Sequence, residues 1–212
     1  VFKKIYEEKI WTPESEKGEF KYYSGLGSHK EDFTENYIEK VSLFLKSLKK
    51  KPSVVELGCG DFVVSSRLVS FTDKYTACDI FEDLINQNKK KYFFPNVFFK
   101  VIDITKDELP SGDICIVRCV LQHLSNEMIT NFLKKIENKY TYLLITEHYP
   151  KKKEFKPNLN IITGPNIRLH LNSAVDLTKE PFNLRFIEET NLCNVYSKLI
   201  VGYLKTQLYK LK

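Results

Sequence analysis

Residues 54–62 read VVELGCGDF, a short apolar run that ends in a turn with two glycines. The run predicts a buried strand, and Gly58 and Gly60 allow the backbone after it to come very close to a ligand. The next stretch, residues 61–71, has the spacing of a helix. A strand, a glycine turn and a helix in this order indicate a ligand site at the end of the strand.

Apolar runs and helical patterns alternate along the rest of the chain. The predicted strands are 53–58, 74–80, 97–103, 113–121 and 141–148, with helices at 34–50, 61–71, 81–93 and 126–138. Apolar strands that alternate with helices are typical of a parallel sheet covered on both faces. Two more strand-like runs, 183–190 and 195–207, predict a terminal hairpin. We therefore expect an α/β fold, a Rossmann-like, doubly wound and mostly parallel seven-stranded sheet with a C-terminal antiparallel hairpin.

The 212 residues fit one domain, residues 1–212. Two stretches, 11–33 and 149–182, lack strong periodicity. Long segments of this kind in a compact domain are often functional covers. We expect residues 1–33 to cover the site from the N-terminal side, and residues 149–182 to cover the acceptor site.

The composition, 42% hydrophobic and 28% charged, is that of a globular protein. No run approaches the roughly 18 apolar residues of a membrane span, and VFKKIYEEKIW lacks the apolar core of a secretory signal, so we expect a cytoplasmic protein. Five cysteines without a CxxC pair predict free thiols and no metal site. The net charge of +6 comes almost entirely from lysines, which predicts a solvated surface and no nucleic-acid partner.

The charges around the glycine turn indicate which ligand it binds. A dinucleotide fingerprint would have a third glycine where this chain has Val63. Glu56 and Asp61 flank the turn where a pyrophosphate would lie, and they would repel it. A ligand with a cationic amino-acid end fits better, and S-adenosylmethionine is such a ligand.

The ends of the next two predicted strands agree with this ligand. Asp79 follows Gly60 by nineteen positions, where a carboxylate can accept hydrogen bonds from ribose hydroxyls. Asp103 and Ile104 could hold an adenine amine and ring face. Each acid alone could simply cap a helix, but three acids in register on consecutive strands favour a ligand site.

These motifs resemble those of the class I S-adenosylmethionine-dependent methyltransferases, over most of the chain. VELGCGDF is similar to their first motif, ACDI to the second, IDI to the third and SGDICIVRCVLQHL to the fourth. The resemblance implies S-adenosyl-L-methionine as cofactor and S-adenosyl-L-homocysteine as product. The implied cofactor-binding residues are Glu56, Gly58, Cys59, Gly60, Asp61, Asp79, Ile80, Asp103, Ile104, Arg118 and Gln122.

A narrower resemblance is to small bacterial methyltransferases associated with capsular and surface-polysaccharide loci. It rests on Trp11, SGLGS at 24–28, LQH at 121–123 and DLTKEPFN at 176–183. It implies a capsular or lipopolysaccharide building block as the methyl acceptor, a small carbohydrate or anionic molecule. Methyl transfer to an oxygen is the favoured reaction, and transfer to a nitrogen is the second.

An alcohol acceptor needs a base, because a free hydroxyl is a poor nucleophile. His123 follows the fourth strand on the edge where ligands of open α/β sheets bind, so it is the first candidate. Glu147 and His148, at the end of the fifth strand, are the next. The other two histidines, His29 and His170, lie in the covers and are expected at the surface.

Four residues of the covers are candidates for binding the acceptor. Arg168 has the fork geometry that suits phosphate or carboxylate, although a salt bridge to Asp176 or another acid would explain it equally well. Trp11 and Tyr23 could close over cofactor or sugar, as could Tyr22 and Tyr149, although core packing is the commoner role of such aromatics. The predicted substrate-binding residues are Trp11, Tyr23, Arg168 and Asp176.

Three alternatives stay open. An NAD-dependent oxidoreductase is disfavoured by Val63 and Asp61. A nucleic-acid-binding or base-modifying module is disfavoured because VLQHL stands where base methyltransferases carry an Asn/Asp-Pro-Pro-aromatic turn. A cofactor-binding partner subunit without its own activity is the third.

Overall fold

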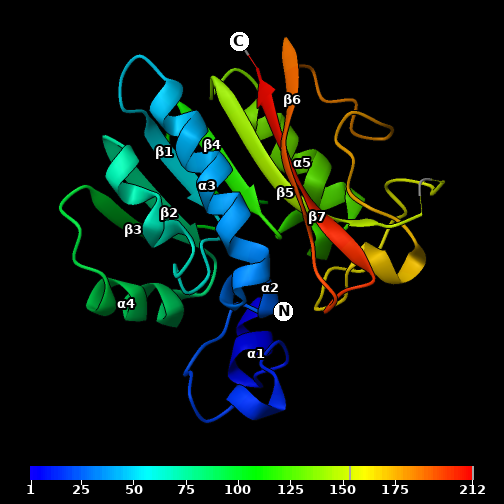
Figure 1. The fold of residues 1–212 in the computed structure, drawn as a ribbon, viewed down its shortest axis with the longest axis horizontal. Coiled ribbons are helices and arrows are strands. Elements are labelled where there is room, and N and C mark those ends of the chain that lie inside the picture. Colours follow the sequence, from blue (N-terminus) through cyan, green and yellow to red (C-terminus); the bar gives the residue numbers. More distant parts are fainter. Residues whose placement is uncertain (153, 212) are drawn as a thin grey trace.

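A mixed sheet of seven strands is the centre of the computed structural model, which describes residues 1–152 and 154–211. The strands lie in the order β3-β2-β1-β4-β5-β7-β6 (Figure 1). They are β1 Ser53–Leu57, β2 Lys74–Asp79, β3 Val97–Val101, β4 Ile114–Arg118, β5 Tyr142–Pro150, β6 Glu188–Tyr196 and β7 Gly202–Lys210. The first five are parallel and β7 is antiparallel to both neighbours, so the predicted fold is confirmed.

Helices cover both faces of the sheet (Figure 1). The α-helices are α1 Phe2–Glu7, α2 Leu26–His29, α3 Glu31–Ser47, α4 Glu82–Lys91 and α5 Asn126–Ile136. Short 3-10 turns lie at η1 Glu14–Glu16, η2 Ser65–Arg67, η3 Val69–Phe71, η4 Leu121–His123 and η5 Arg168–Leu171. In the view of Figure 1, α3 crosses in front of the sheet and α5 lies behind it.

Apolar spacing explains why these helices pack as they do. Tyr37, Val41 and Leu45 recur every four residues of α3, and all are buried against the front face of the sheet. On α5, Ile129, Phe132 and Ile136 recur at spacings of three and four and are buried against the rear face. Each face of the sheet is therefore covered by an apolar core. Because β1–β5 are parallel, their carboxyl ends lie along one edge of the sheet.

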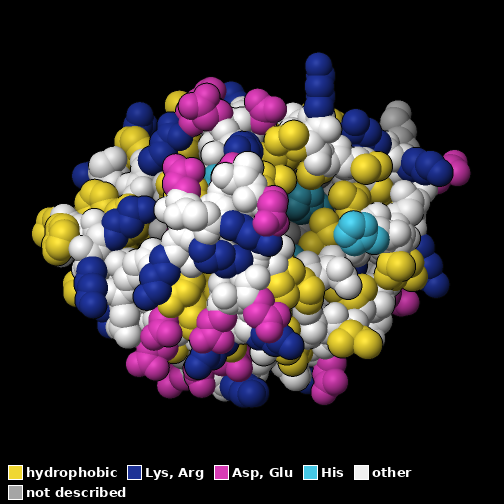
Figure 2. Space-filling view, turned by 90° about the horizontal axis from the view of Figure 1, so that it is seen from below, with side chains coloured by type: hydrophobic (Ala, Val, Ile, Leu, Met, Phe, Trp, Pro, Cys, Tyr) yellow, Lys and Arg dark blue, Asp and Glu magenta, His cyan; other side chains and the backbone are white. Residues whose placement is uncertain are grey.

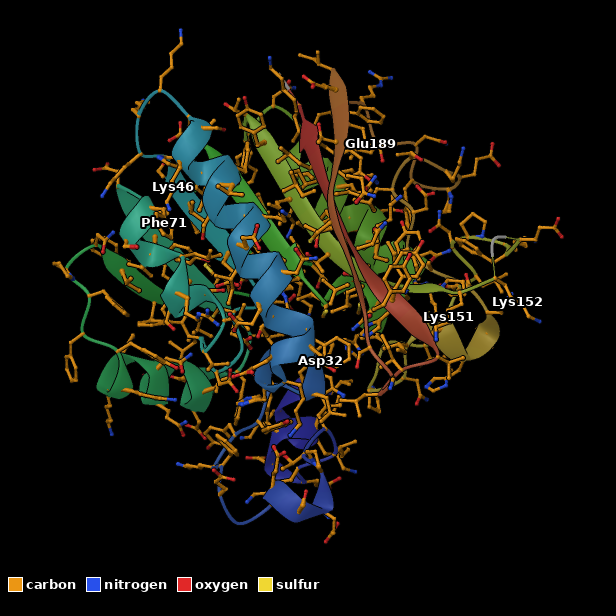
Figure 3. All side chains as sticks on the ribbon, viewed as in Figure 1. Asp32, Lys46, Phe71, Lys151, Lys152 and Glu189 are labelled. Carbon is orange, nitrogen blue, oxygen red and sulfur yellow. The ribbon has the colours of Figure 1, made fainter. Side chains whose placement is uncertain are left out.

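The predicted helix 61–71 is wrong. Two 3-10 turns, η2 and η3, replace it. Phe62 has φ +61°, which an α-helix cannot contain, and the Asp61 carboxylate accepts the backbone N–H of Val63. In Figure 3, Lys46 of α3 extends towards Phe71 of η3, with its ammonium 4.6 Å from the ring centroid.

The predicted position of the hairpin turn is also wrong, although the hairpin is present. Strand β6 runs through residues 191–194, with an irregularity between Asn191 and Cys193. An edge strand tolerates polar residues of this kind because one of its sides faces solvent. The tip consists of residues 197–201, whose apolar LIV sequence resembles a strand.

Candidate functional site

A cavity of about 610 Å³ opens at the edge where the parallel strands end. Its volume falls within the roughly 300–1,000 Å³ range of small-molecule sites. Figure 2, viewed from this edge, shows hydrophobic and histidine side chains around a hollow. The chain order reverses between β1 and β4, and ligands of open α/β sheets bind at such a crevice.

The glycine turn forms one wall of the cavity. Gly58 and Gly60 have φ of +83° and +55°, which side chains rarely adopt. A Cβ on Gly58 would lie 2.3 Å from Val120 Cγ2, and one on Gly60 would lie 2.3 Å from Ser24 Oγ. The Gly60 N–H donates to Asp79 Oδ2 at 3.0 Å, and its carbonyl accepts from Asn88 Nδ2 at 2.7 Å. The turn is thus held rigidly against the cavity.

Glu56 and Asp79 line this wall and are almost fully buried. Glu56 accepts hydrogen bonds from the hydroxyls of Ser65 and Tyr75. Burial raises the pKa of Glu56 to about 7 and also raises the pKa of Asp79. Two buried carboxylates with raised pKa values favour a positively charged ligand beside them.

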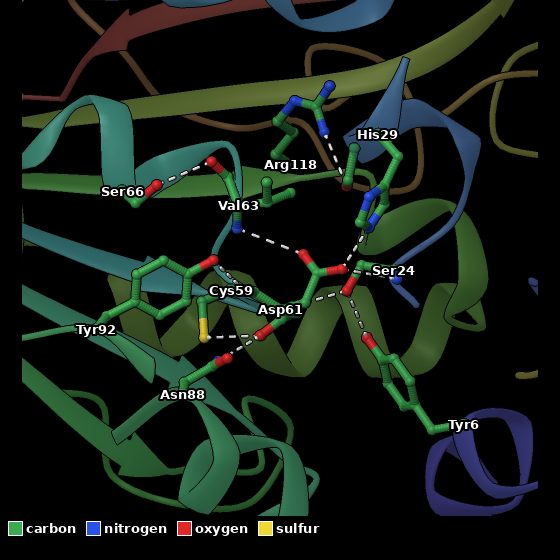
Figure 4. A network of polar contacts seen from close by, with 12 residues as sticks. Tyr6, Ser24, His29, Cys59, Asp61, Val63, Ser66, Asn88, Tyr92 and Arg118 are labelled. Carbon is green, nitrogen blue, oxygen red and sulfur yellow. Dashed lines mark hydrogen bonds and ion pairs between the residues drawn. The ribbon is translucent and has the colours of Figure 1, made fainter. Parts of the chain in front are cut away.

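Asp61 joins the glycine turn to the N-terminal segment (Figure 4). Its Oδ2 accepts from the backbone N–H of Ser24 at 3.2 Å, and His29 Nε2 lies 2.5 Å from the same oxygen. The Asp61 N–H donates to Ser24 Oγ at 2.8 Å, and Tyr6 OH lies 3.3 Å from that hydroxyl. Residues 1–30 therefore close one side of the cavity.

Two predictions about this segment need correction. His29 is not a surface residue, since its side chain is only 11% exposed and contacts Asp61. Tyr23 does not line the cavity, and its ring stacks on His29 with a centroid distance of 4.0 Å. The sequence does not indicate the cavity position of Tyr6 or the contact of Ser24 with Asp61, although Ser24 belongs to the SGLGS segment at 24–28.

The other predicted cofactor residues also lie on the cavity wall. Asp103 is oriented by Thr105, whose backbone N–H and hydroxyl both donate to Oδ1, at 2.9 and 2.6 Å. Arg118 donates to the Gly27 carbonyl at 2.6 Å and so fixes the SGLGS segment. The cavity-lining residues from the predicted cofactor set are Glu56, Gly58, Cys59, Gly60, Asp61, Asp79, Ile80, Asp103, Ile104, Arg118 and Gln122.

Two of the three predicted catalytic residues face the cavity. His123 follows β4 in η4, where Trp11 packs on its ring at a centroid distance of 4.9 Å. His148 lies near the end of β5, and both histidines line the cavity. Burial lowers the pKa of His123 to about 4 and that of His148 to about 3, so both rings are neutral at pH 7.

Glu147 is not among the residues that line the cavity. Its two oxygens accept the backbone N–H groups of Leu121 and Gln122, at 2.9 and 3.1 Å. Burial raises the pKa of this carboxyl group to about 8. Glu147 therefore has a structural role, because its carboxyl group holds η4 in place through these two hydrogen bonds.

Arg168 was predicted to bind the acceptor, but all its donors are used within the protein. It is 1% exposed, and its five N–H groups donate to protein oxygens. These are the carbonyls of Leu159, Leu121, Gln122 and Leu124 and the Asn126 side chain, at 2.7–3.2 Å.

The remaining residues of the second cover have mixed positions. Asp176 accepts from the backbone N–H and hydroxyl of Thr178 and is not a cavity residue. Tyr149 is buried and donates to the Val175 carbonyl at 2.9 Å. Exposed His170 and residues 163, 165 and 167 do line the cavity, so part of this segment borders the site.

Within residues 1–152 and 154–211, no helix has the length and apolar character needed to cross a membrane. No protein-family model matches the chain, and no curated protein matches it.

Solved structures do share its fold. The chain is similar to the N-methyltransferase NodS from Bradyrhizobium japonicum WM9 in complex with S-adenosyl-L-homocysteine, with a TM-score of 0.65, 12% identity and 97% and 96% of the two chains covered. It is also similar to magnesium protoporphyrin IX methyltransferase from Synechocystis PCC 6803 with bound S-adenosyl-L-homocysteine (TM-score 0.56, 13% identity, 82% of each chain). A third is human N-acetylserotonin methyltransferase in complex with S-adenosylmethionine (TM-score 0.54, 15% identity, 98% of this chain and 62% of that one). At these identities the likeness establishes the fold, and that fold is the α/β architecture seen in S-adenosylmethionine-dependent methyltransferases.

Proposed function

We propose that the chain is an S-adenosylmethionine-dependent methyltransferase that acts on an oxygen, or as second choice a nitrogen, of a small acceptor molecule. The observation that carries this proposal is the convergence of Glu56, Asp79 and Asp103 on one cavity beside a glycine turn. These acids come from the ends of three consecutive strands. A cationic amino-acid end beside Glu56 and a ribose beside Asp79 would suit them, whereas a pyrophosphate would be repelled.

The residues present fit the cofactor. A Cβ on Gly58 would collide with Val120, and a Cβ on Gly60 would collide with Ser24. Both positions therefore require glycine, and the backbone of the turn has no side chain there. Asp79 has both oxygens oriented by backbone N–H groups and retains lone pairs for ribose hydroxyls. Asp103 and Ile104 would hold the adenine.

The bound cofactor would supply a methyl group activated on a sulfonium. The chain itself would orient the acceptor and exclude water, since proximity and orientation can supply much of the rate. The N-terminal segment helps to exclude water from the cavity, because Trp11 packs over His123 and donates to the Pro165 carbonyl at 3.5 Å.

For the acceptor we propose a small sugar-like molecule, and capsular-polysaccharide precursors are the first class to screen. The argument for a phosphorylated acceptor is weakened because the donors of Arg168 are all used within the protein. His123 and His148 stay as candidates for receiving the acceptor's proton.

Calorimetry with S-adenosylmethionine, S-adenosyl-L-homocysteine and NAD tests the proposal. Because Glu56 has a pKa of about 7, a cationic ligand that pairs with its ionised form must release a proton on binding. We expect the affinity for S-adenosylmethionine to rise from pH 6 to pH 8. Binding of NAD alone, with affinity that falls over this range, would overturn the proposal.

Variants at acidic residues sharpen the calorimetric test. Asp79→Asn removes the charge and half of the acceptor capacity, and we expect at least a tenfold loss of affinity. Asp83→Asn, on the exposed face of α4, is the matched control and should bind as the wild type does. Circular dichroism checks that both variants are folded.

A further inference from the structure

The Gln122 amide lies between the two cavity histidines. Its Oε1 is 2.5 Å from His148 Nδ1, and its Nε2 is 3.3 Å from His123 Nε2. The two imidazoles are therefore joined through one side chain that has donors at one end and an acceptor at the other.

The orientation of this amide is decided by Cys119. Gln122 Nε2 lies 3.4 Å from the Cys119 carbonyl oxygen, which can only accept a hydrogen bond. If the amide were reversed, its oxygen would face that carbonyl and the contact would be repulsive. The NH₂ group must thus face Cys119 and His123, and the amide oxygen must face His148.

This orientation fixes the tautomer of both rings. Each ring is neutral at pH 7 because burial lowers its pKa, so each carries one N–H and one lone pair. His123 Nε2 faces an amide donor and must carry the lone pair, which leaves the hydrogen on Nδ1. His148 Nδ1 faces an amide acceptor and must carry the hydrogen, which leaves the lone pair on Nε2.

The two rings differ in what they offer to a ligand. His123 Nδ1 is buried and has no hydrogen-bond partner among the described residues. The backbone at residues 164–166 offsets part of the fall in the pKa of this ring, which still stays neutral at pH 7. Neither nitrogen of His123 is then a free acceptor. His148 lines the cavity, and its Nε2 makes no hydrogen bond within residues 1–152 and 154–211.

We infer that His148, rather than His123, receives the proton of the methyl acceptor at Nε2, and that Gln122 is the positioning residue that sets both tautomers. The inference rests on the proposed function. As the acceptor oxygen bonds to the methyl carbon, its proton passes to His148 Nε2, and the electron pair of the broken carbon–sulfur bond stays on sulfur. The acceptor must therefore offer an O–H or N–H. A carboxylate, which has no proton to give, is disfavoured.

Nitrogen NMR on the intact protein tests the tautomers without any cofactor. Long-range ¹H–¹⁵N spectra of histidine-labelled protein at pH 7 distinguish ring nitrogens that carry hydrogen from those that do not. The four histidines are assigned by single His→Gln variants, and if one variant fails to fold, the other three assign its signals by elimination. We expect His123 and His148 both in the Nδ1–H form. The Nε2–H form at His148 would overturn the inference.

Two further measurements complete the test. In Gln122→Met the side chain keeps its length but loses the amide, and we expect His148 to shift toward the Nε2–H form. An unchanged His148 tautomer in that variant would contradict the role of Gln122. Diethylpyrocarbonate, which attacks an imidazole lone pair, should modify His148 in the wild type and spare His123, as seen by peptide mass mapping. The reverse order would refute the assignment, whereas the proposed function stands or falls separately on S-adenosylmethionine binding.

Discussion

Replacing Arg168 should destabilise the fold strongly, whether or not a ligand is bound. This side chain lies at the start of η5 in the connection between β5 and β6, and its guanidinium contacts the turn that follows β4. Removing it would take the guanidinium donor from the carbonyls of Leu159, Gln122 and Leu124, whereas the Leu121 carbonyl keeps the backbone N–H of Leu124 at 3.0 Å. Burial also lowers the pKa of Arg168, in agreement with its withdrawal from water.

The size of the effect follows from these hydrogen bonds. Each hydrogen bond to a charged group contributes roughly 1.5–3 kcal/mol, but five bonds from one side chain are not additive, and burying the charge is itself costly. A buried acceptor left without its donor costs roughly 1–3 kcal/mol, and three carbonyls lose the guanidinium donor here, so we expect Arg168→Met to lose about 4 kcal/mol of unfolding free energy. For a chain of this length that corresponds to a fall of roughly 8–16 °C in Tm. Arg168→Lys keeps the charge but has at most three donors, so its loss should be about half as large.

Urea unfolding followed by circular dichroism measures these losses. Arg185→Met, at an exposed position between β5 and β6, is the matched control and should leave the midpoint unchanged. If Arg168 served to bind an anionic acceptor, its loss would instead weaken ligand binding and leave the unfolding midpoint near that of the wild type. An Arg168→Met variant within about 1 kcal/mol of the wild type would therefore refute our reasoning, because three carbonyls left without a donor should together cost several times more.

Three other outcomes are expected. Gly60→Ala should weaken S-adenosylmethionine binding at least tenfold in calorimetry, because the new Cβ would displace the N-terminal segment, whereas Gly18→Ala has open space and should bind normally. Burial raises the pKa of Glu147 from 4.5 to about 8, so its stabilising contribution is fully present below about pH 4.5 and is lost as pH rises to about 8. Urea midpoints should therefore fall between about pH 5 and pH 8 and level off above that, and Glu147→Gln should flatten the fall. His29→Ala removes the partner of a glycine-turn carboxylate, so limited proteolysis should cleave residues 12–30 faster than in the wild type, while exposed His170→Ala leaves the rate unchanged.

The fold was predictable because it depends on local patterns. Continuous apolar strands that alternate with helical spacing specify a parallel sheet, and the structure has the seven strands that these patterns predict. Where the local pattern was misleading, the fold differs. The apolar residues 197–201 have the pattern of a strand but form the hairpin tip, and Phe62 adopts a left-handed conformation that no propensity indicates.

The cofactor side of the site was predictable for a related reason. Glu56, Asp79 and Asp103 lie within two residues of strand ends, and the backbone alone brings such positions to one edge of a parallel sheet. Arg168 was not predictable, because four of its five acceptors belong to residues 121–126, more than forty positions away. Spacing along the chain carries no information about such contacts.

Glu147 and His148 show most clearly where sequence reasoning stops. Both belong to β5, and successive side chains of a strand point to opposite sides. The sequence therefore implied that only one of the two could face the cavity, so naming both as catalytic candidates was inconsistent with the strand that carries them. Which one faces it depends on the turn after β4, whose backbone N–H groups bind the Glu147 carboxylate. That choice leaves His148 beside the cavity, and it places Gln122, one of the two residues that Glu147 holds, in the position where its amide can orient the His148 ring.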